Sequence, residues 1–206
     1  MIVIIDYGVG NLGSIRNMLK RVGAQDVTVS SSPTEVAEAE RLILPGVGSF
    51  DNAARRLRES GVLASLEERV LRAGTPILGI CLGMQLFMDG SEEGVEPGLG
   101  WIPGRTVRFR ESAGRSLRIP HMGWNTIDPV REDGLLAGMD PEAAYYFVHS
   151  YHVECAVPGD VLATTEHGYA FASVIRRGNI MGTQFHPEKS HRHGMQIFRN
   201  FLEAAC

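Results

Sequence analysis

Short apolar runs alternate with longer helix-like stretches in the first half of the chain. The apolar runs, each of a length typical of a buried strand, lie at residues 1–6, 26–30, 41–45 and 76–80. Helical segments are expected over 12–21, from Ser32-Pro33 onward, and over 50–72 with an interruption at Gly61. Short strands separated by helices of this length predict an α/β fold with a doubly wound, mainly parallel sheet.

After about residue 98 the pattern changes to short segments of alternating polarity. These lie at 106–110, 145–154, 161–166, 172–177 and 179–185. They predict antiparallel strands added to the parallel sheet. A final amphipathic helix is expected at 195–204. No internal repeat, low-complexity tract or linker interrupts the chain, so residues 1–206 are expected to form a single domain.

Composition narrows the class of protein. The chain is 44% hydrophobic and 21% charged, with a formal net charge of -4 and no long run of like charge, which gives no electrostatic case for nucleic-acid binding. No apolar segment has membrane-spanning length, and the N-terminus reads as a strand, not a signal peptide. Cys81, Cys155 and Cys206 are odd in number and lack metal-type spacing, so we expect no disulfide framework and a cytoplasmic location. We also expect no metal and no cofactor.

One of these cysteines stands where a strand turns into a helix. The apolar run ends on Cys81, which is flanked by Gly79 and Gly83, and the period then becomes helical through Leu82, Gln85, Leu86 and Met88. Small neighbours permit a sharp turn that pushes the side chain outward, as in a nucleophile elbow of the form G-x-C-x-G. The following helix N-terminus favours the reactive thiolate, and the Leu82 N–H could hold an oxyanion. A buried structural cysteine is the alternative.

A candidate base follows the last predicted strand. His186 lies just beyond that strand and precedes Pro187 and Glu188. Strand ends of a parallel sheet gather at one edge, so His186 can meet Cys81, and Glu188 can fold back to accept the Nδ1 proton. Cys81, His186 and Glu188 are thus a candidate triad of nucleophile, base and orienter. A metal site of His186 with His191 and His193 is disfavoured, because no further ligand has matching spacing.

Two glycine-containing loops follow strands. Gly46 and Gly48 lie after the third strand, on the edge where open α/β sheets bind ligands, and this loop could supply a second oxyanion donor or simply form a turn. Gly8, Gly10 and Gly13 match a dinucleotide fingerprint, but the acidic residue expected after the second strand is missing. Nucleotide binding is therefore rejected as the main function.

Taken together, the motifs PGVGSF, GICLGMQLF and GTQFHPEKS resemble those of the class I, triad-type glutamine amidotransferases. The resemblance runs through the whole chain and implies their flavodoxin-like fold. It also implies hydrolysis of the side-chain amide of L-glutamine. The segments IIDYGVGNLGSI, PHMGWN and YFVHSYHV are similar, within that class, to the glutaminase subunits of imidazole glycerol phosphate synthase.

The resemblance also implies roles for individual residues. Leu82 and the loop of Gly46, Val47 and Gly48 would hold the oxyanion. Gln85 follows Cys81 by one helical turn, on the same face, and would reach the bound glutamine. The segment corresponding to His149, Ser150 and Tyr151 would hold the amino acid end of the substrate.

A partner protein is implied as well. In the resembled family a (β/α)8-barrel synthase subunit takes the ammonia and forms imidazole glycerol phosphate and AICAR in histidine biosynthesis. Candidates for the docking face are Tyr7, Asn11, Pro120, Met122 and Trp124, although the apolar PHMGW cluster could equally be core. We expect low glutaminase activity in isolation and strong stimulation by the partner, because the flexible PGVG loop could gate the oxyanion hole.

Two further classes of function fit the same residues. A stand-alone cysteine peptidase or γ-glutamyl hydrolase would use the same triad on the same fold without a partner. A non-catalytic binding module would carry the triad without using it. The response of Cys81 to glutamine-like electrophiles and the effect of replacing Cys81 separate these possibilities.

Overall fold

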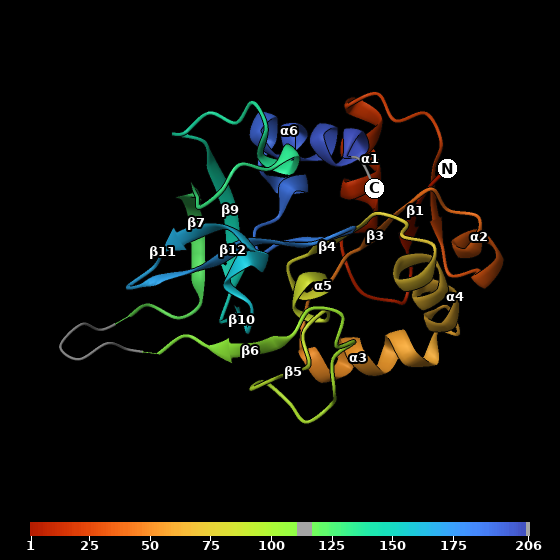
Figure 1. Cartoon of the computed structure of the whole chain (residues 1–206), viewed down its shortest axis with the longest axis horizontal. Helices are drawn as coiled ribbons and strands as arrows, with labels where there is room; N and C mark the ends of the chain where they lie inside the picture. Colours follow the sequence, from red (N-terminus) through yellow and green to blue (C-terminus); the bar gives the residue numbers. More distant parts are fainter. Residues whose placement is uncertain (111–116, 205–206) are drawn as a thin grey trace.

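The computed structural model describes residues 1–110 and 117–204 and is built around an eleven-stranded sheet (Figure 1). The central path has the order β2-β1-β3-β4-β13-β12-β10-β6-β5; β11 pairs with β12, and β8 pairs with β11. The strands of the parallel part are β1 (Ile2–Ile5), β2 (Val27–Ser30), β3 (Arg41–Leu44), β4 (Ile77–Ile80) and β13 (Ile180–Thr183). This order and direction confirm the predicted doubly wound, flavodoxin-like sheet.

Helices cover both faces of the parallel strands because alternate strand residues point in opposite directions. Ile4, Ile43 and Leu78 pack in one core with α1 (Leu12–Arg21) and α6 (His191–Glu203). The alternate positions Val3, Leu42 and Ile77 belong to a second core. Its helical cover consists of α2 (Pro33–Ala37), α3 (Phe50–Glu59), α4 (Leu63–Glu67) and its π-helical continuation η1 (Glu68–Arg72). Figure 1 shows α1 and α6 on one side of the sheet and α3 on the other.

The helix boundaries follow local signals. Ser32 caps α2 by accepting a hydrogen bond from the Glu35 N–H, and Pro33 occupies its first turn, as predicted. The predicted interruption at Gly61 separates α3 from α4, where the glycine has φ +78°. The last helix starts at His191, four residues before the predicted start, because Ser190 ends the preceding 3₁₀ turn and the helix follows at once.

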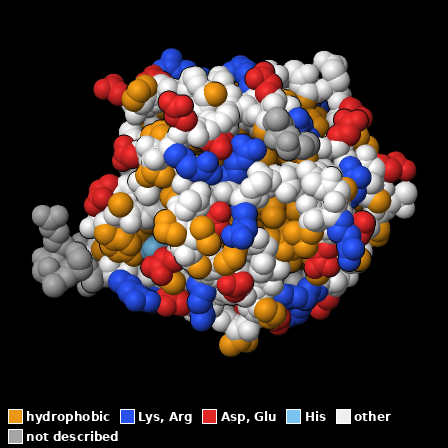
Figure 2. Space-filling view, in the orientation of Figure 1, with side chains coloured by type: hydrophobic (Ala, Val, Ile, Leu, Met, Phe, Trp, Pro, Cys, Tyr) orange, Lys and Arg blue, Asp and Glu red, His pale blue; other side chains and the backbone are white. Residues whose placement is uncertain are grey.

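Antiparallel strands extend the sheet beyond β13, as predicted. They are β12 (Ala170–Arg177), β11 (Val161–Glu166), β10 (Tyr151–Cys155), β6 (Gly104–Arg108) and the short strands β8 (Asp128–Pro129) and β5 (Gly90–Ser91), of which β5 runs parallel to β6. Figure 2 shows acidic and basic side chains interspersed over one face of the molecule. Within the described residues, no helix combines the length and apolar character needed to cross a membrane.

The segment predicted as one strand at 145–154 is instead two strands in different sheets. β9 (Ala144–His149) pairs with β7 (His121–Thr126) in a separate two-stranded sheet, whereas β10 joins the large sheet. The chain changes sheets at Ser150, where the alternating burial of β9 gives way to the consecutive buried residues His152 and Val153. No glycine or proline marks this change, so the polarity pattern alone did not reveal it.

The carboxyl ends of β4 and β13 meet at one edge of the sheet. Ile80 is paired with Thr183, and the Cys81 N–H donates a 2.8 Å hydrogen bond to the Thr183 carbonyl oxygen. The residues that follow the two strands are therefore neighbours, although about a hundred positions separate them in the sequence.

Candidate active site

Cys81 forms a strained corner between β4 and the short helix α5 (Leu82–Gln85). Its backbone has φ +53° and ψ -109°, in the region that side-chain-bearing residues seldom occupy. Such a conformation costs on the order of 1–3 kcal/mol and persists only where surrounding structure holds it. The corner is the backbone geometry that the G-x-C-x-G pattern predicts.

Close backbone packing holds this corner. A Cβ added at Gly83 would overlap the Leu44 carbonyl oxygen, and one added at Gly79 would lie 2.7 Å from the Met84 nitrogen. A Cβ at Gly46 would lie 2.5 Å from the Gly83 nitrogen, so the PGVG loop also lies directly against the elbow. Glycine is needed at these three positions because a side chain would overlap neighbouring atoms. The glycines thereby allow the third strand, the loop and the nucleophile turn to pack against one another.

The helix after Cys81 is shorter than the apolar period predicted. It ends at Gln85, and the Phe87 and Met88 N–H groups donate to carbonyls three residues back. The carbonyls of Leu86, Phe87 and Met88 instead accept hydrogen bonds from the backbone of residues 99–102. Tertiary pairing thus replaces helical pairing after one turn, and the helix contributes a smaller dipole at Cys81 than a long helix would.

His186 and Glu188 form a buried pair at the end of β13. The His186 Nδ1–H donates a 2.8 Å hydrogen bond to Glu188 Oε1, and both side chains are 2% exposed. Burial lowers the pKa of His186, but the Cys81 charge, hydrogen bonds to Cys81 and Glu188 and the Glu188 charge outweigh it and raise the pKa to about 10. The histidine therefore faces Cys81 as a ready proton donor.

Neighbouring backbone fixes the histidine in place. The His186 N–H donates to the Tyr146 carbonyl at 2.9 Å, and the Ser190 hydroxyl donates to the His186 carbonyl at 2.7 Å. The 3₁₀ turn η4 (Pro187–Lys189) folds Glu188 back toward the ring.

The described part of the chain contains no cluster of three or more His, Cys, Asp or Glu suited to a metal ion. His191 stacks on Trp124, with ring centroids 5.2 Å apart.

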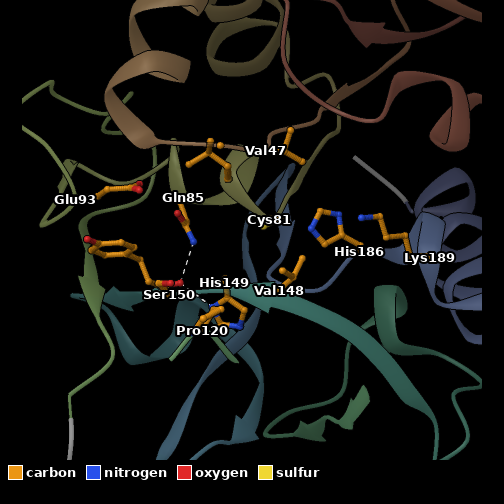
Figure 3. A pocket seen from close by; sticks show the side chains of 13 residues that line it. Val47, Cys81, Gln85, Glu93, Pro120, Val148, His149, Ser150, His186 and Lys189 are labelled. Atoms are coloured by element: carbon orange, nitrogen blue, oxygen red, sulfur yellow. Dashed lines mark hydrogen bonds between the residues drawn. The ribbon is translucent and has the colours of Figure 1, made fainter. Parts of the chain in front are cut away.

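Cys81 and His186 open into a cavity of about 450 Å³ at this edge of the sheet (Figure 3). This volume suits a small organic ligand. Many of the residues singled out from the sequence line this cavity: Val47, Gly48, Cys81, Leu82, Gln85, Pro120, His149, Ser150, Tyr151 and His186. Gly46 packs behind them. The structure thus brings the predicted nucleophile, base and binding segments together around one cavity.

Three further lining residues were not predicted from the sequence. Glu93 comes from a turn after β5 and accepts a hydrogen bond from the Phe50 N–H, a contact without a local sequence signal. Val148 belongs to the strand that was assigned in one piece with β10. Lys189 lies within the HPEKS motif, next to Glu188, and its Nζ lies 5.5 Å from the centre of the Tyr146 ring, so its position in the motif was the available signal.

The side chains of two residues expected to contact the substrate glutamine are hydrogen-bonded to other groups of the protein. Gln85 Nε2 donates to the Tyr151 carbonyl at 3.0 Å and to Gln184 Oε1 at 3.1 Å. The ring of His149 uses Nδ1 on the Tyr151 carbonyl at 2.8 Å and Nε2 on His121 at 3.1 Å. His149 can therefore face a ligand with its backbone but not with a spare ring nitrogen.

The predicted docking residues differ in exposure. Met122 and Trp124 are exposed on β7, Pro120 is exposed at the cavity rim, and Asn11 is half-buried. Tyr7 does not fit the expectation of a docking residue, because its side chain is buried and its hydroxyl donates to the Pro45 carbonyl. Burial raises the pKa of Tyr7, and so does the charge of Cys81. Tyr7 therefore anchors the start of the PGVG loop and offers no exposed side chain to a partner.

A family model for the class I glutamine amidotransferases matches residues 3–205. The chain belongs to that family. This class I glutamine amidotransferase is 49% identical to the Pseudomonas aeruginosa protein named imidazole glycerol phosphate synthase subunit HisH 2, over 98% of this chain and 99% of the relative. It is 46% identical to subunit HisH of Bdellovibrio bacteriovorus, over 98% and 100% of the two chains. The family resemblance inferred from the motifs is confirmed.

Solved structures share the fold of this amidotransferase at low identity. A crystal structure described as a glutamine amidotransferase has a TM-score of 0.73 at 20% identity, covering 98% of each chain. A putative GMP synthase protein from Thermoplasma acidophilum has a TM-score of 0.69 at 21% identity, covering 98% of this chain and 92% of the other. The predicted fold class is confirmed by both.

Proposed function

We propose that the chain is the glutaminase subunit of an imidazole glycerol phosphate synthase. The observation that carries the proposal is the strained Cys81 corner, which opens onto the same small cavity as His186, whose ring is hydrogen-bonded to Glu188. Near-complete matches to proteins named as HisH subunits support the choice of synthase. We also propose that residues 1–206 act as one domain, because β4 of the first half and β13 of the second are neighbours in one sheet.

Cys81 attacks the side-chain amide carbon of glutamine. A bond forms between Sγ and that carbon, and the carbonyl oxygen takes the negative charge of the tetrahedral intermediate. His186 then gives its proton to the amide nitrogen, the C–N bond breaks and ammonia leaves. Because the His186 pKa is raised to about 10, the ring carries this proton at neutral pH, and Glu188 holds it in the required orientation.

Water completes the reaction on the resulting γ-glutamyl thioester. His186, now neutral, takes a proton from water as the oxygen attacks the thioester carbon, and the S–C bond breaks to release glutamate. The backbone N–H of Leu82 and the loop of Gly46, Val47 and Gly48 hold the oxyanion in both steps. Gln85 and the backbone of residues 149–151 hold the substrate against the cavity wall, which they line.

Ammonia protonates in water and is then no longer a nucleophile, so an efficient glutaminase passes it directly to a partner. We assign that role to a (β/α)8-barrel synthase subunit that forms imidazole glycerol phosphate and AICAR. The exposed Met122 and Trp124, with Pro120 and Asn11, form the proposed docking face near the cavity. The complex works in the cytoplasm without a metal or cofactor in this chain, and docking stimulates a low basal glutaminase activity.

A synthase assay with two nitrogen sources tests this function. The chain is mixed with the barrel subunit, co-purified, and supplied with the barrel subunit's ribonucleotide substrate plus either glutamine or an ammonium salt at alkaline pH. We expect product from ammonium with the barrel subunit by itself, and product from glutamine only when the chain is present. Product from ammonium but none from glutamine with the chain present would overturn the proposal.

A further inference from the structure

A cluster of histidines lies beside the cavity, where the two sheets meet. His121, His149 and His152 are buried, and His167 stacks on His121 with ring centroids 4.2 Å apart. Phe109 lies among them, 5.2 Å from His149 and 4.7 Å from His152 between ring centroids. The proposed reaction uses none of these rings, so their burial next to the cavity points to a different role.

The hydrogen bonds of two of these rings have fixed directions. The Tyr151 carbonyl can only accept, so His149 Nδ1 carries the proton of their 2.8 Å bond. Nε2 of the neutral His149 ring then accepts, and His121 Nδ1 donates to it at 3.1 Å. His121 Nε2 in turn accepts from the Asn125 amide at 3.2 Å. Burial lowers the pKa of His149 well below its usual value, and burial and the His167 charge lower that of His121 to about 4, so both rings are neutral at pH 7.

The chain of hydrogen bonds continues to the nucleophile. The Tyr151 carbonyl also accepts from Gln85 Nε2 at 3.0 Å, and the same amide donates to Gln184 Oε1 at 3.1 Å. Gln184 Nε2 then lies 3.6 Å from Cys81 Sγ as a donor. Neighbouring members orient one another through these hydrogen bonds, so one misdirected ring disturbs those that follow.

We propose that His121 is a positioning residue of the glutamine site. It touches neither the nucleophile nor the cavity, and acts by holding the His149 ring in one tautomer and orientation. That ring fixes the Tyr151 carbonyl, which orients the Gln85 amide on the cavity wall. The Gln85 amide in turn orients Gln184, the donor to the nucleophilic sulfur. This inference rests on the proposed glutaminase function.

A pair of amide variants tests this role. In His121→Asn the amide nitrogen takes the place of Nδ1 and still donates to His149, whereas in His121→Gln the amide lies near the former Nε2 and that bond is lost. In the synthase complex, we expect His121→Gln to raise the KM for glutamine about tenfold with kcat within about threefold, because a buried acceptor loses its donor. His121→Asn should restore the KM to within about threefold of the wild type.

Two controls separate positioning from packing. His167→Phe keeps a ring stacked on His121 but lies outside the chain of hydrogen bonds, since its own Nε2 bonds the Arg118 carbonyl, and it should leave the KM unchanged. The ring ¹⁵N chemical shifts of the unaltered protein should show protonated Nδ1 on both His121 and His149. This measurement needs no variant, so it decides the tautomers even if His121→Gln does not fold.

The outcomes that overturn the inference are distinct from failure of the function. Equal KM values for the wild type and a folded His121→Gln would overturn it, and so would equal losses in the Asn and Gln variants, or a His149 protonated on Nε2. Absence of glutamine-dependent activity in the wild-type complex would instead overturn the proposed function itself.

Discussion

The two walls of the cavity are built differently. On one wall, Cys81 and His186 are buried at the ends of two paired strands, with Glu188 bonded to the histidine, and backbone contacts too close for a Cβ hold the turn. On the other wall, Val47 and Gly48 are exposed, and a Cβ added at Gly48 would meet no atom within 4 Å. The reactive groups are thus fixed by packing, whereas the exposed loop contributes backbone and leaves its side chains free to change.

Replacing the nucleophile should have the largest effect on the buried wall. Cys81→Ala removes the atom that forms the thioester, and we expect glutamine-dependent ammonia release to fall on the order of 10⁴-fold or more. The matched control is Cys155→Ala, because Cys155 is the other free cysteine among the described residues and lies outside the cavity. Unchanged ammonia release by Cys81→Ala would contradict the assignment of the reactive group to the buried wall.

The orienting carboxylate should come next in size. Glu188→Gln keeps a hydrogen-bond acceptor near His186 but removes the negative charge that helps to raise its pKa. We expect kcat to fall about 10²-fold because less of the His186 ring is protonated at neutral pH, and the thermal midpoint to fall because the buried ring loses its charged partner. Steady-state kinetics and a thermal melt of the same sample measure both. A wild-type kcat in this variant would show that Glu188 does not orient the base.

The close contacts of the elbow can be tested against the open loop. Gly83→Ala places a Cβ against the Leu44 carbonyl, and we expect it to lower the free energy of unfolding by about 1–3 kcal/mol. Val47→Ala is the counterpart on the exposed wall, where the change should stay within about 0.5 kcal/mol. Urea unfolding of both variants measures the difference. Equal losses would contradict the contrast between a packed and an open wall.

The pH dependence of stability gives a further test of the buried wall. The pKa of His186 is raised from 6.5 to about 10 in the folded protein, so its protonated form favours folding. This contribution is fully present below pH 6.5 and is lost as the pH rises toward 10. The free-energy difference between the wild type and His186→Gln, measured by urea unfolding at several pH values, should therefore shrink over that window. A difference that grows with pH would contradict the assigned direction.

Much of the fold could be predicted because it depends on local patterns. The buried runs of β1, β3 and β4 mark the parallel strands, and the glycines around Cys81 mark the elbow. The division of residues 145–154 between two sheets was not predicted, since alternation continues up to His149 without a breaking residue. The burial of Tyr7, a candidate for the docking face, was not predicted, because a tyrosine after a strand gives no local sign of its bond to Pro45.

Long-range hydrogen bonds account for most of what was missed at the site. Gln85 and Gln184 are 99 positions apart, and His121 and His149 are 28 apart, so no motif spacing reports their contact. Glu93 lines the cavity from a turn whose neighbours carry no recognisable pattern. The triad residues were accessible because each lies at or just beyond a strand end, whereas the residues that hold them depend on how the two sheets pack.

Covalent trapping tests the central claim most directly. The synthase complex is treated with an electrophilic glutamine analogue, and separately with peptide-based electrophiles, and the adducts are located by mass spectrometry. We predict a single adduct on Cys81 with the glutamine analogue, protection by added glutamine, and no adduct with the peptides. Labelling by peptides instead, or labelling of Cys155 while Cys81 stays free, would contradict the assignment of Cys81 as a glutamine-directed nucleophile.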